Sequence, residues 1–148
     1  MILTRQGLPC LEDTAGANTK RGGYVLESAS DSDPQLILLA SGSEVAPTCE
    51  AASSLRAKGI RSRVVNLPCW ELFESQSEEY RRSVLLPEVG ARMAVEAGSP
   101  LGWERYVGMS GAVHGIDRFG ASAPIKALTE KFGYTPGAIA AKAETLLG

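Results

Sequence analysis

The stretch "ASGSEV", at the end of the apolar run Leu36–Ala40, is the candidate for a phosphate-binding turn in this chain. A dinucleotide-binding turn requires G-x-G-x-x-G and a P-loop requires G-x-x-x-x-G-K-[ST], because closely spaced glycines let backbone N–H groups reach the phosphates. This turn supplies Gly42 alone. The sequence therefore predicts a structural turn, with a weak anion site at Gly42 and Ser43 as the alternative.

Pro47 locates the start of the helix that follows, because proline is tolerated only in the first helical turn. Ser41 and Glu44 would make a capping box but would place Pro47 in the second turn, whereas Ser43 as the cap places it at the edge of the first. We therefore expect Ser43 to cap this helix. Glu44 would then occupy the first helical position, where its carboxylate complements the helix dipole and repels a phosphate.

His114 is the only histidine in the chain. A lone imidazole in a glycine-rich loop can act as a general base or contact a substrate. The sequence offers it neither a nucleophile elbow nor a second histidine, so a structural histidine is the simpler interpretation. Asp117 and Arg118 are candidate partners for it or for each other.

Glu96 is placed by the sequence at the carboxyl end of a strand, where open α/β sheets bind ligands. The residues after it are Ala-Gly, and no acid–base partner is visible in the sequence. We therefore expect its carboxylate to accept N–H bonds from the backbone of that turn.

Composition sets the class of protein. A chain of 148 residues fits one domain that buries roughly 70% of its unfolded surface. Interspersed charges with a net of −2 favour neither nucleic acid nor an anionic membrane as a partner. No apolar run approaches the roughly 20 residues that span a bilayer, and no secretory pattern is present. We expect a cytoplasmic protein, with Cys10, Cys49 and Cys69 as reduced core thiols.

The pattern of apolar residues predicts a linker arm at 1–21 and one folded unit at 22–148. A strand at Leu36–Ala40, a helix at Glu44–Lys58 and a strand in "RSRVVNL" form a strand–helix–strand unit, whose strands must be parallel with a right-handed crossover. Gly59 is expected to be the left-handed cap at the end of that helix.

The other expected elements are short. They are a strand at Tyr24–Leu26, one or two helical turns in "PCWELFESQSEEYRRSVL", a strand at Met93–Glu96, a strand in the glycine-rich stretch 102–120, and two final helices capped by Ser122 and Thr135.

Several motifs in series carry a family resemblance. "LTRQGLP", "RGGYVL", "ILLASGSEV", "GIRSRVVNLPCWELFESQSEEYRRSVL", "MAVEAG", "GWERYVG" and "FGASAP" occur in this order across nearly the whole chain. Together they resemble the C-terminal domain of transketolase. The resemblance implies a three-layer α/β/α domain with a mostly parallel five-stranded sheet and one antiparallel strand, for which Tyr24–Leu26 is the candidate.

The same resemblance implies a parent enzyme of the pentose phosphate pathway that transfers a two-carbon ketol unit between sugar phosphates. Thiamine diphosphate and a divalent cation, Mg²⁺ or Ca²⁺, would be bound by two preceding domains at a homodimer interface, and none of these groups would be bound by this chain. The domain alone would be inactive and would serve assembly or regulation. The rival interpretation is a free-standing nucleotide- or anion-binding α/β module.

Arg5 is the one substrate-binding residue that the resemblance implies. The arginine of the family's "TRQ" stretch contacts the phosphate of the sugar substrate, and here that stretch is "LTRQ". A guanidinium offers two parallel donors to a phosphate, which suits this role. The "MI" before this stretch resembles a translation start. We therefore expect the chain to be either an expressed fragment or a proteolytic remnant of a longer enzyme.

Overall fold

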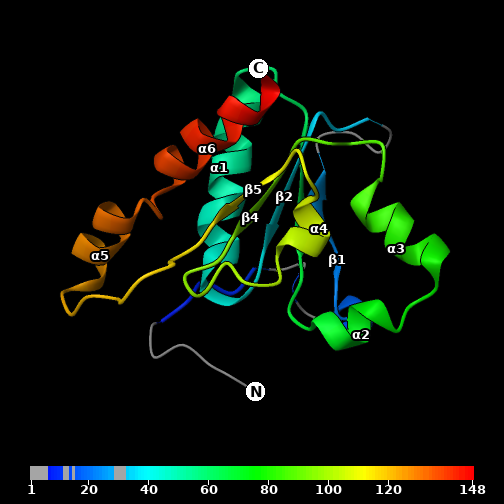
Figure 1. Cartoon of the computed structure of the whole chain (residues 1–148), viewed down its shortest axis with the longest axis horizontal. Helices are drawn as coiled ribbons and strands as arrows, with labels where there is room; N and C mark the ends of the chain where they lie inside the picture. The colour runs from blue at the N-terminus through cyan, green and yellow to red at the C-terminus, as the bar shows by residue number, and fades with distance from the viewer. Residues whose placement is uncertain (1–6, 12–13, 15, 29–32) are drawn as a thin grey trace.

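The computed structural model describes residues 7–11, 14, 16–28 and 33–148. They form a five-stranded sheet between two helical layers, with strand order β1-β3-β2-β4-β5 (Figure 1). β1 runs antiparallel to β3, and every other pairing is parallel. The expected three-layer fold with one antiparallel strand is confirmed. The strands are β1 (Tyr24–Ser28), β2 (Leu36–Ala40), β3 (Ser62–Asn66), β4 (Arg92–Val95) and β5 (Ala112–His114).

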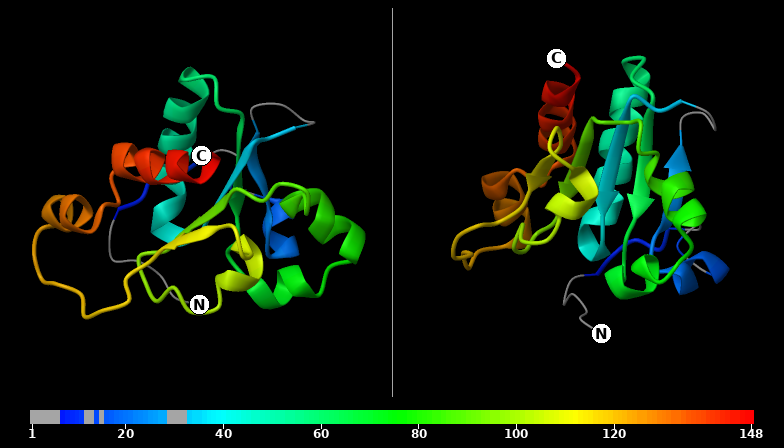
Figure 2. Two further views of the ribbon diagram at one scale, coloured as in Figure 1. Left: turned by 45° about the horizontal axis from the view of Figure 1, so that its top comes forward. Right: turned by 45° about the vertical axis from the view of Figure 1, so that its right-hand side comes forward.

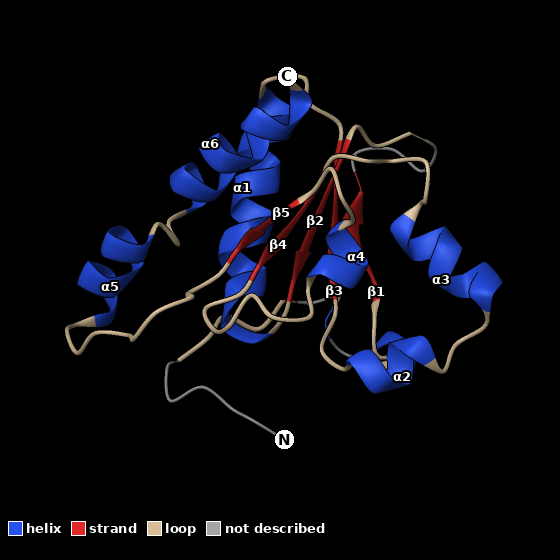
Figure 3. Ribbon diagram, in the orientation of Figure 1, coloured by secondary structure: helices blue, strands red, loops and turns tan. Residues whose placement is uncertain are grey.

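The helices divide between the two faces of the sheet, as Figure 3 shows. One layer contains α1 (Val45–Ala57) and α6 (Pro136–Glu144), and the other contains α2 (Trp70–Glu74), α3 (Glu78–Leu85) and α4 (Glu104–Val107). The remaining helix, α5 (Ile125–Phe132), stands to one side (Figures 1 and 2). Short 3-10 turns are η2 (Ala17–Arg21), η3 (Gly42–Glu44) and η4 (Thr145–Leu147).

The central strand β2 explains why the sheet is covered on both sides. All five of its residues are buried, and they alternate between the two layers. Leu36 and Leu38 belong to the core under α1 and α6, whereas Ile37 and Leu39 belong to the core under α2, α3 and α4. A continuous apolar run is what a parallel strand with two covered faces requires.

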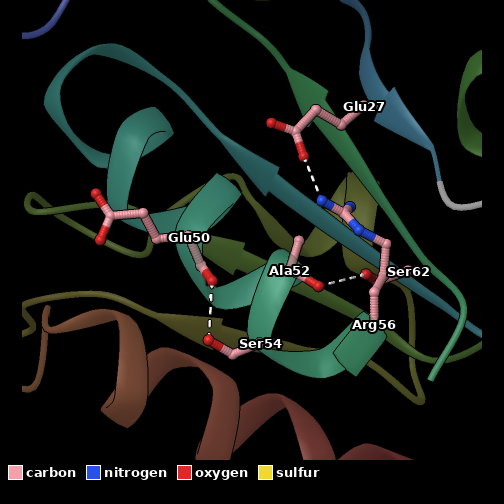
Figure 4. Close-up of polar contacts among 6 residues, drawn as sticks. All are labelled: Glu27, Glu50, Ala52, Ser54, Arg56 and Ser62. Carbon is pink, nitrogen blue, oxygen red and sulfur yellow. Dashed lines mark hydrogen bonds and ion pairs between the residues drawn. The ribbon is translucent and has the colours of Figure 1, made fainter. Parts of the chain in front are cut away.

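Helix α1 packs on the sheet with the face that its sequence predicts, because Val45, Cys49, Ala52 and Leu55 are all buried. Gly59 follows it with φ of 84°, which confirms the expected left-handed residue. Polar contacts fix the helix to the sheet (Figure 4). In that view Arg56 pairs with Glu27 of β1 at 2.7 Å, and the Ser62 hydroxyl donates to the carbonyl of Ala52 at 3.3 Å.

The start of α1 corrects the expectation for Ser43. The helix begins at Val45 with Glu44 at the cap position, and no side chain caps it. The preceding turn η3 satisfies its own donors, since the Val45 N–H bonds to the carbonyl of Gly42 and the Glu44 N–H bonds to that of Ser41. Pro47 is therefore the third helical residue, where no hydrogen bond is lost.

The caps of the last two helices differ in outcome. Thr135 accepts from the Ala138 N–H with Pro136 at the first helical position, as expected. Ser122 was expected to cap α5, and this is wrong. Helix α5 begins only at Ile125, after Pro124 with φ of −54° and ψ of 141°. A proline disfavours helical geometry in the residue before it, which is Ala123 here. A helix capped by Ser122 would need Ala123 as its first helical residue, so the helix cannot start there.

The three cysteines are free thiols, but only one of them is a core residue. Cys49 is buried, Cys69 is half-buried and Cys10 is exposed, so the expectation of a core position is confirmed for Cys49 and is wrong for Cys10 and Cys69. Burial, reinforced by the nearby Glu27 carboxylate, raises the pKa of Cys49 to about 12. That thiol is therefore protonated and unreactive near neutral pH.

Candidate functional site

The connectivity of the sheet places one candidate site at the carboxyl ends of β2 and β4. From β2 the chain crosses one face through α1 to reach β3, and it then crosses the other face through α2 and α3 to reach β4 on the opposite side of β2. In open α/β sheets, ligands bind outside the carboxyl ends of the strands at such a switch point. Ala40 and Val95 are paired in register, so Ser41 and Glu96 emerge side by side at this edge.

Glu96 interacts with side chains distant in sequence, which corrects the expectation that its carboxylate binds the backbone of the following turn. The Ser41 hydroxyl lies 3.4 Å from its Oε2, and the Trp103 side chain also hydrogen bonds to the carboxylate. Burial, and then repulsion from Glu44, raise the pKa of Glu96 above its ordinary value, against the opposing effect of these two donors.

Glu44 is the second carboxylate at this edge, and nothing in the sequence indicated that it lies near Glu96. Its side chain is only 9% exposed, and the Ser43 hydroxyl donates to its Oε1 at 2.6 Å. Thr48 donates to its carbonyl at 2.7 Å, which holds this residue at the helix start. The turn of the weak anion alternative therefore has two carboxylates beside it. Two negative charges beside the turn repel an anion at Gly42 and Ser43. The alternative of a weak anion site there stays an untested prediction.

Tyr134 is the residue of this edge that sequence reasoning missed. It lies between α5 and α6, is buried, and donates from its hydroxyl to the carbonyl of Glu96 at 2.7 Å, with the carbonyl of His114 at 3.3 Å. It thereby joins the ends of β4 and β5. Burial raises its pKa to about 12, so the phenol stays protonated as a donor. The local sequence "GYTP" gives no signal of this contact.

His114 is held by neighbours rather than presented to a ligand. Its ring centroid lies 4.5 Å from that of Tyr134, and its Nδ1 lies 3.2 Å from the Nζ of Lys142. An ammonium group only donates, so Nδ1 accepts and the ring is neutral. Burial, and then the charge of Lys142, lower the pKa of His114. The partner is therefore Lys142, and the surroundings favour the structural interpretation.

This edge of the sheet carries two carboxylates, each beside a serine hydroxyl that donates to it, and an indole. Within residues 7–11, 14, 16–28 and 33–148, no trio of His, Cys, Asp or Glu is arranged to hold a metal ion. Negative charge at the edge also opposes a diphosphate, so these residues do not fit thiamine diphosphate. Arg5, the expected phosphate contact, lies outside the described residues.

The strand order and the helices on both faces of the sheet define an open, doubly wound α/β domain. The family model for the "Transketolase-like TK C-terminal domain" matches residues 22–135. Transketolase 7 of Craterostigma plantagineum is 47% identical over 149 residues, covering 99% of this chain and 22% of that protein. A transketolase of Geobacillus stearothermophilus is 43% identical over 151 residues, covering 100% of this chain and 23% of that protein.

Solved structures agree with these sequence matches. Transketolase from Pichia stipitis in complex with sedoheptulose-7-phosphate superposes with a TM-score of 0.85 at 36% identity, over 97% of this chain and 20% of that chain. Transketolase from Leishmania mexicana gives a TM-score of 0.79 at 38% identity, over 88% of this chain and 18% of that chain. The chain belongs to the transketolase C-terminal domain family. It spans about a fifth of the length of these curated relatives.

Within the same described residues, no helix combines the length and the apolar character needed to cross a membrane.

Proposed function

We propose that this chain is the C-terminal domain of a longer transketolase, which moves a two-carbon ketol unit between sugar phosphates in the pentose phosphate pathway. The observation that carries the proposal is the match to transketolases over 99% of the chain, which accounts for only 22% of the relative's length. The Pichia stipitis enzyme of the same fold forms a complex with a sugar phosphate, which supports this class of substrate.

In this proposal, thiamine diphosphate and Mg²⁺ or Ca²⁺ belong to the preceding domains and to the homodimer that they form. When bound, the cofactor supplies the carbanion chemistry of ketol transfer. The acidic pair Glu44 and Glu96 supports a site elsewhere, because it is a poor place for a diphosphate. We infer that this domain serves assembly or regulation rather than catalysis, in a cytoplasmic enzyme.

Arg5 is the residue of this chain that we propose to contact substrate. Its motif "LTRQ" matches the family stretch whose arginine binds the sugar phosphate. A charge-assisted, two-pronged contact to a phosphate suits a guanidinium better than an ammonium. The boundary between the arm at 1–21 and the domain at 22–148 belongs to the same proposal.

The test is the intact mass of the source polypeptide, followed by a coupled assay of ketol transfer on that polypeptide. We expect a mass several times the 15.6 kDa of this chain and turnover that depends on thiamine diphosphate. A longer polypeptide that binds the cofactor but does not transfer a ketol unit would overturn the proposed activity. A source polypeptide no longer than this chain would overturn the proposed domain organisation.

A further inference from the structure

Residues 117–132, here called the projecting segment, extend away from the three layers of the fold. They comprise the loop after Ile116 and helix α5, and the segment stands out from the sheet and its helical layers in Figures 1 and 2. Every residue from 117 to 127 is exposed, and α5 contains no buried residue. Most of the surface of this segment is therefore left uncovered by the described part of the chain.

The segment nevertheless carries large apolar side chains. Phe119 is 98% exposed and Ile125 is 50% exposed, and Leu128 follows Ile125 on the same side of the helix at three-residue spacing. An eight-residue helix is too short to be stable in water by itself, so its stability has to come from packing. Exposed apolar groups gathered on one segment mark an interaction surface.

The base of the segment is anchored. Phe132 packs against the core under α1 and α6, and the Arg118 guanidinium lies 5.3 Å from the centre of its ring. Ile116, just before the segment, packs against the same core and donates from its N–H to the carbonyl of Gly98 at 2.8 Å. The base is therefore fixed in position, which holds Phe119 and Ile125 toward solvent.

The position of the entering chain favours one occupant for this surface. Leu11, from the arm through which the preceding domains would connect, packs against the same core as Ile116 and Phe132. If the proposed function holds, the missing domains are tethered on this side of the molecule. A short tether gives an effective concentration on the order of millimolar, which favours intramolecular docking over a second copy of the chain.

We propose that the projecting segment, with Phe119 and Ile125 at its centre, is the surface by which this domain docks onto the preceding domains of its own polypeptide. This inference rests on the proposed function, because it requires those domains to exist. Docking would bury the apolar side of α5 and supply the packing that the isolated helix lacks.

The first experiment replaces Phe119 with a photo-reactive benzoylphenylalanine in the full-length source polypeptide. Because the Phe119 side chain is exposed, the replacement does not disturb this domain. We expect a cross-link to residues that precede this chain. The matched control places the same group at Leu72, which is 45% exposed. This residue belongs to α2, which lies across the molecule from α5 in Figure 1, and no such cross-link is expected from it.

The second experiment compares amide hydrogen exchange of α5 in this chain and in the full-length polypeptide. We expect exchange to be slowed about tenfold or more by docking, and Phe119→Asp to remove most of that protection. The same substitution should leave the unfolding midpoint of the 148-residue chain unchanged, because Phe119 has no packing to lose there.

Equal exchange of α5 in the two proteins would overturn the docking surface, and so would a Phe119 cross-link to a second copy of this domain. A full-length polypeptide that shows both the cross-link and the protection, but no ketol transfer, would overturn the proposed activity and leave the docking surface intact. A source polypeptide no longer than this chain would overturn both.

Discussion

The Glu96 carboxyl group experiences opposing influences at the carboxyl edge of the sheet. Burial and the Glu44 carboxylate favour its protonated form, whereas the donors on Ser41 and Trp103 favour the ionised form, and the first pair prevails. A carboxyl group with a raised folded-state pKa adds stability below its ordinary pKa. That contribution is lost as pH rises through the folded-state value.

Glu96→Gln should therefore make the chain more stable near neutral pH. The amide removes the ionisation, and its carbonyl oxygen can still accept from Ser41 and Trp103. We expect the gain, measured by denaturant unfolding, to be largest at about pH 8 and to vanish below about pH 4. Glu130→Gln, at an exposed position of α5, controls for the loss of one surface charge. A gain from Glu96→Gln that is the same at both pH values would contradict the assignment.

Arg5→Ala tests the proposed substrate contact in the full-length enzyme. Loss of a charge-assisted contact to phosphate, roughly 1.5–3 kcal/mol, should raise KM for phosphorylated sugars by about ten- to 150-fold with kcat little changed. Steady-state kinetics with an unphosphorylated acceptor is the control and should show little effect. Arg5→Lys should recover only part of the loss. If both classes of substrate weaken alike, Arg5 supports the arm rather than the phosphate.

Among the elements, helix starts show how one kind of signal leads to different structures. At α6, the Thr135 side chain caps the helix and Pro136 is the first helical residue, so the helix begins where the sequence predicts. Ser43 has the same capping chemistry, yet its hydroxyl donates to the Glu44 carboxylate because the 3-10 turn η3 already satisfies the nearby donors. A cap forms only where the backbone leaves donors unsatisfied.

Thr135→Ala and Ser43→Ala make a matched pair of substitutions. We expect Thr135→Ala to cost about 1 kcal/mol of unfolding free energy, because it removes a cap that forms. Ser43→Ala should cost less than about half of that, because no N–H bond is lost. Denaturant melts at one pH measure both changes. A larger cost for Ser43→Ala would show that its contact with Glu44, or an unrecognised cap, stabilises α1.

At the scale of the whole molecule, the sheet is enclosed by two apolar cores, one on each face. These cores belong to this domain alone, which is consistent with independent folding. The carboxyl edge of the sheet is held by contacts within the domain, from Ser41 to Glu96 and from Tyr134 to the ends of β4 and β5. These contacts stabilise the fold.

The 148-residue chain should therefore unfold cooperatively, show no ketol transfer above a blank, and give no calorimetric signal with thiamine diphosphate and Mg²⁺. The physical reason is that the carboxyl edge of the sheet carries the negative charge of Glu44 and Glu96, which opposes binding of a diphosphate. The chain must be purified away from host transketolase, and the full-length enzyme serves as the positive control. Turnover by the purified chain would contradict the assignment to assembly or regulation.

The sequence by itself determined the elements whose signals are local. The apolar run of β2, the buried face of α1, the left-handed Gly59 and the cap at Thr135 depend on residues a few positions apart, and periodicity and turn chemistry report them directly. The series of motifs also indicated the family, because it extends over nearly the whole chain.

Only the tertiary structure decided the contacts of the candidate site. Ser41 meets Glu96 across 55 residues, Tyr134 reaches the ends of two strands, and Lys142 approaches His114 across 28 residues. Such contacts depend on which strands are neighbours and where the chain crosses the sheet, so no local pattern encodes them. The exposure of Phe119 is likewise a property of the folded chain, because an apolar residue in a sequence gives no sign of whether its own domain will cover it.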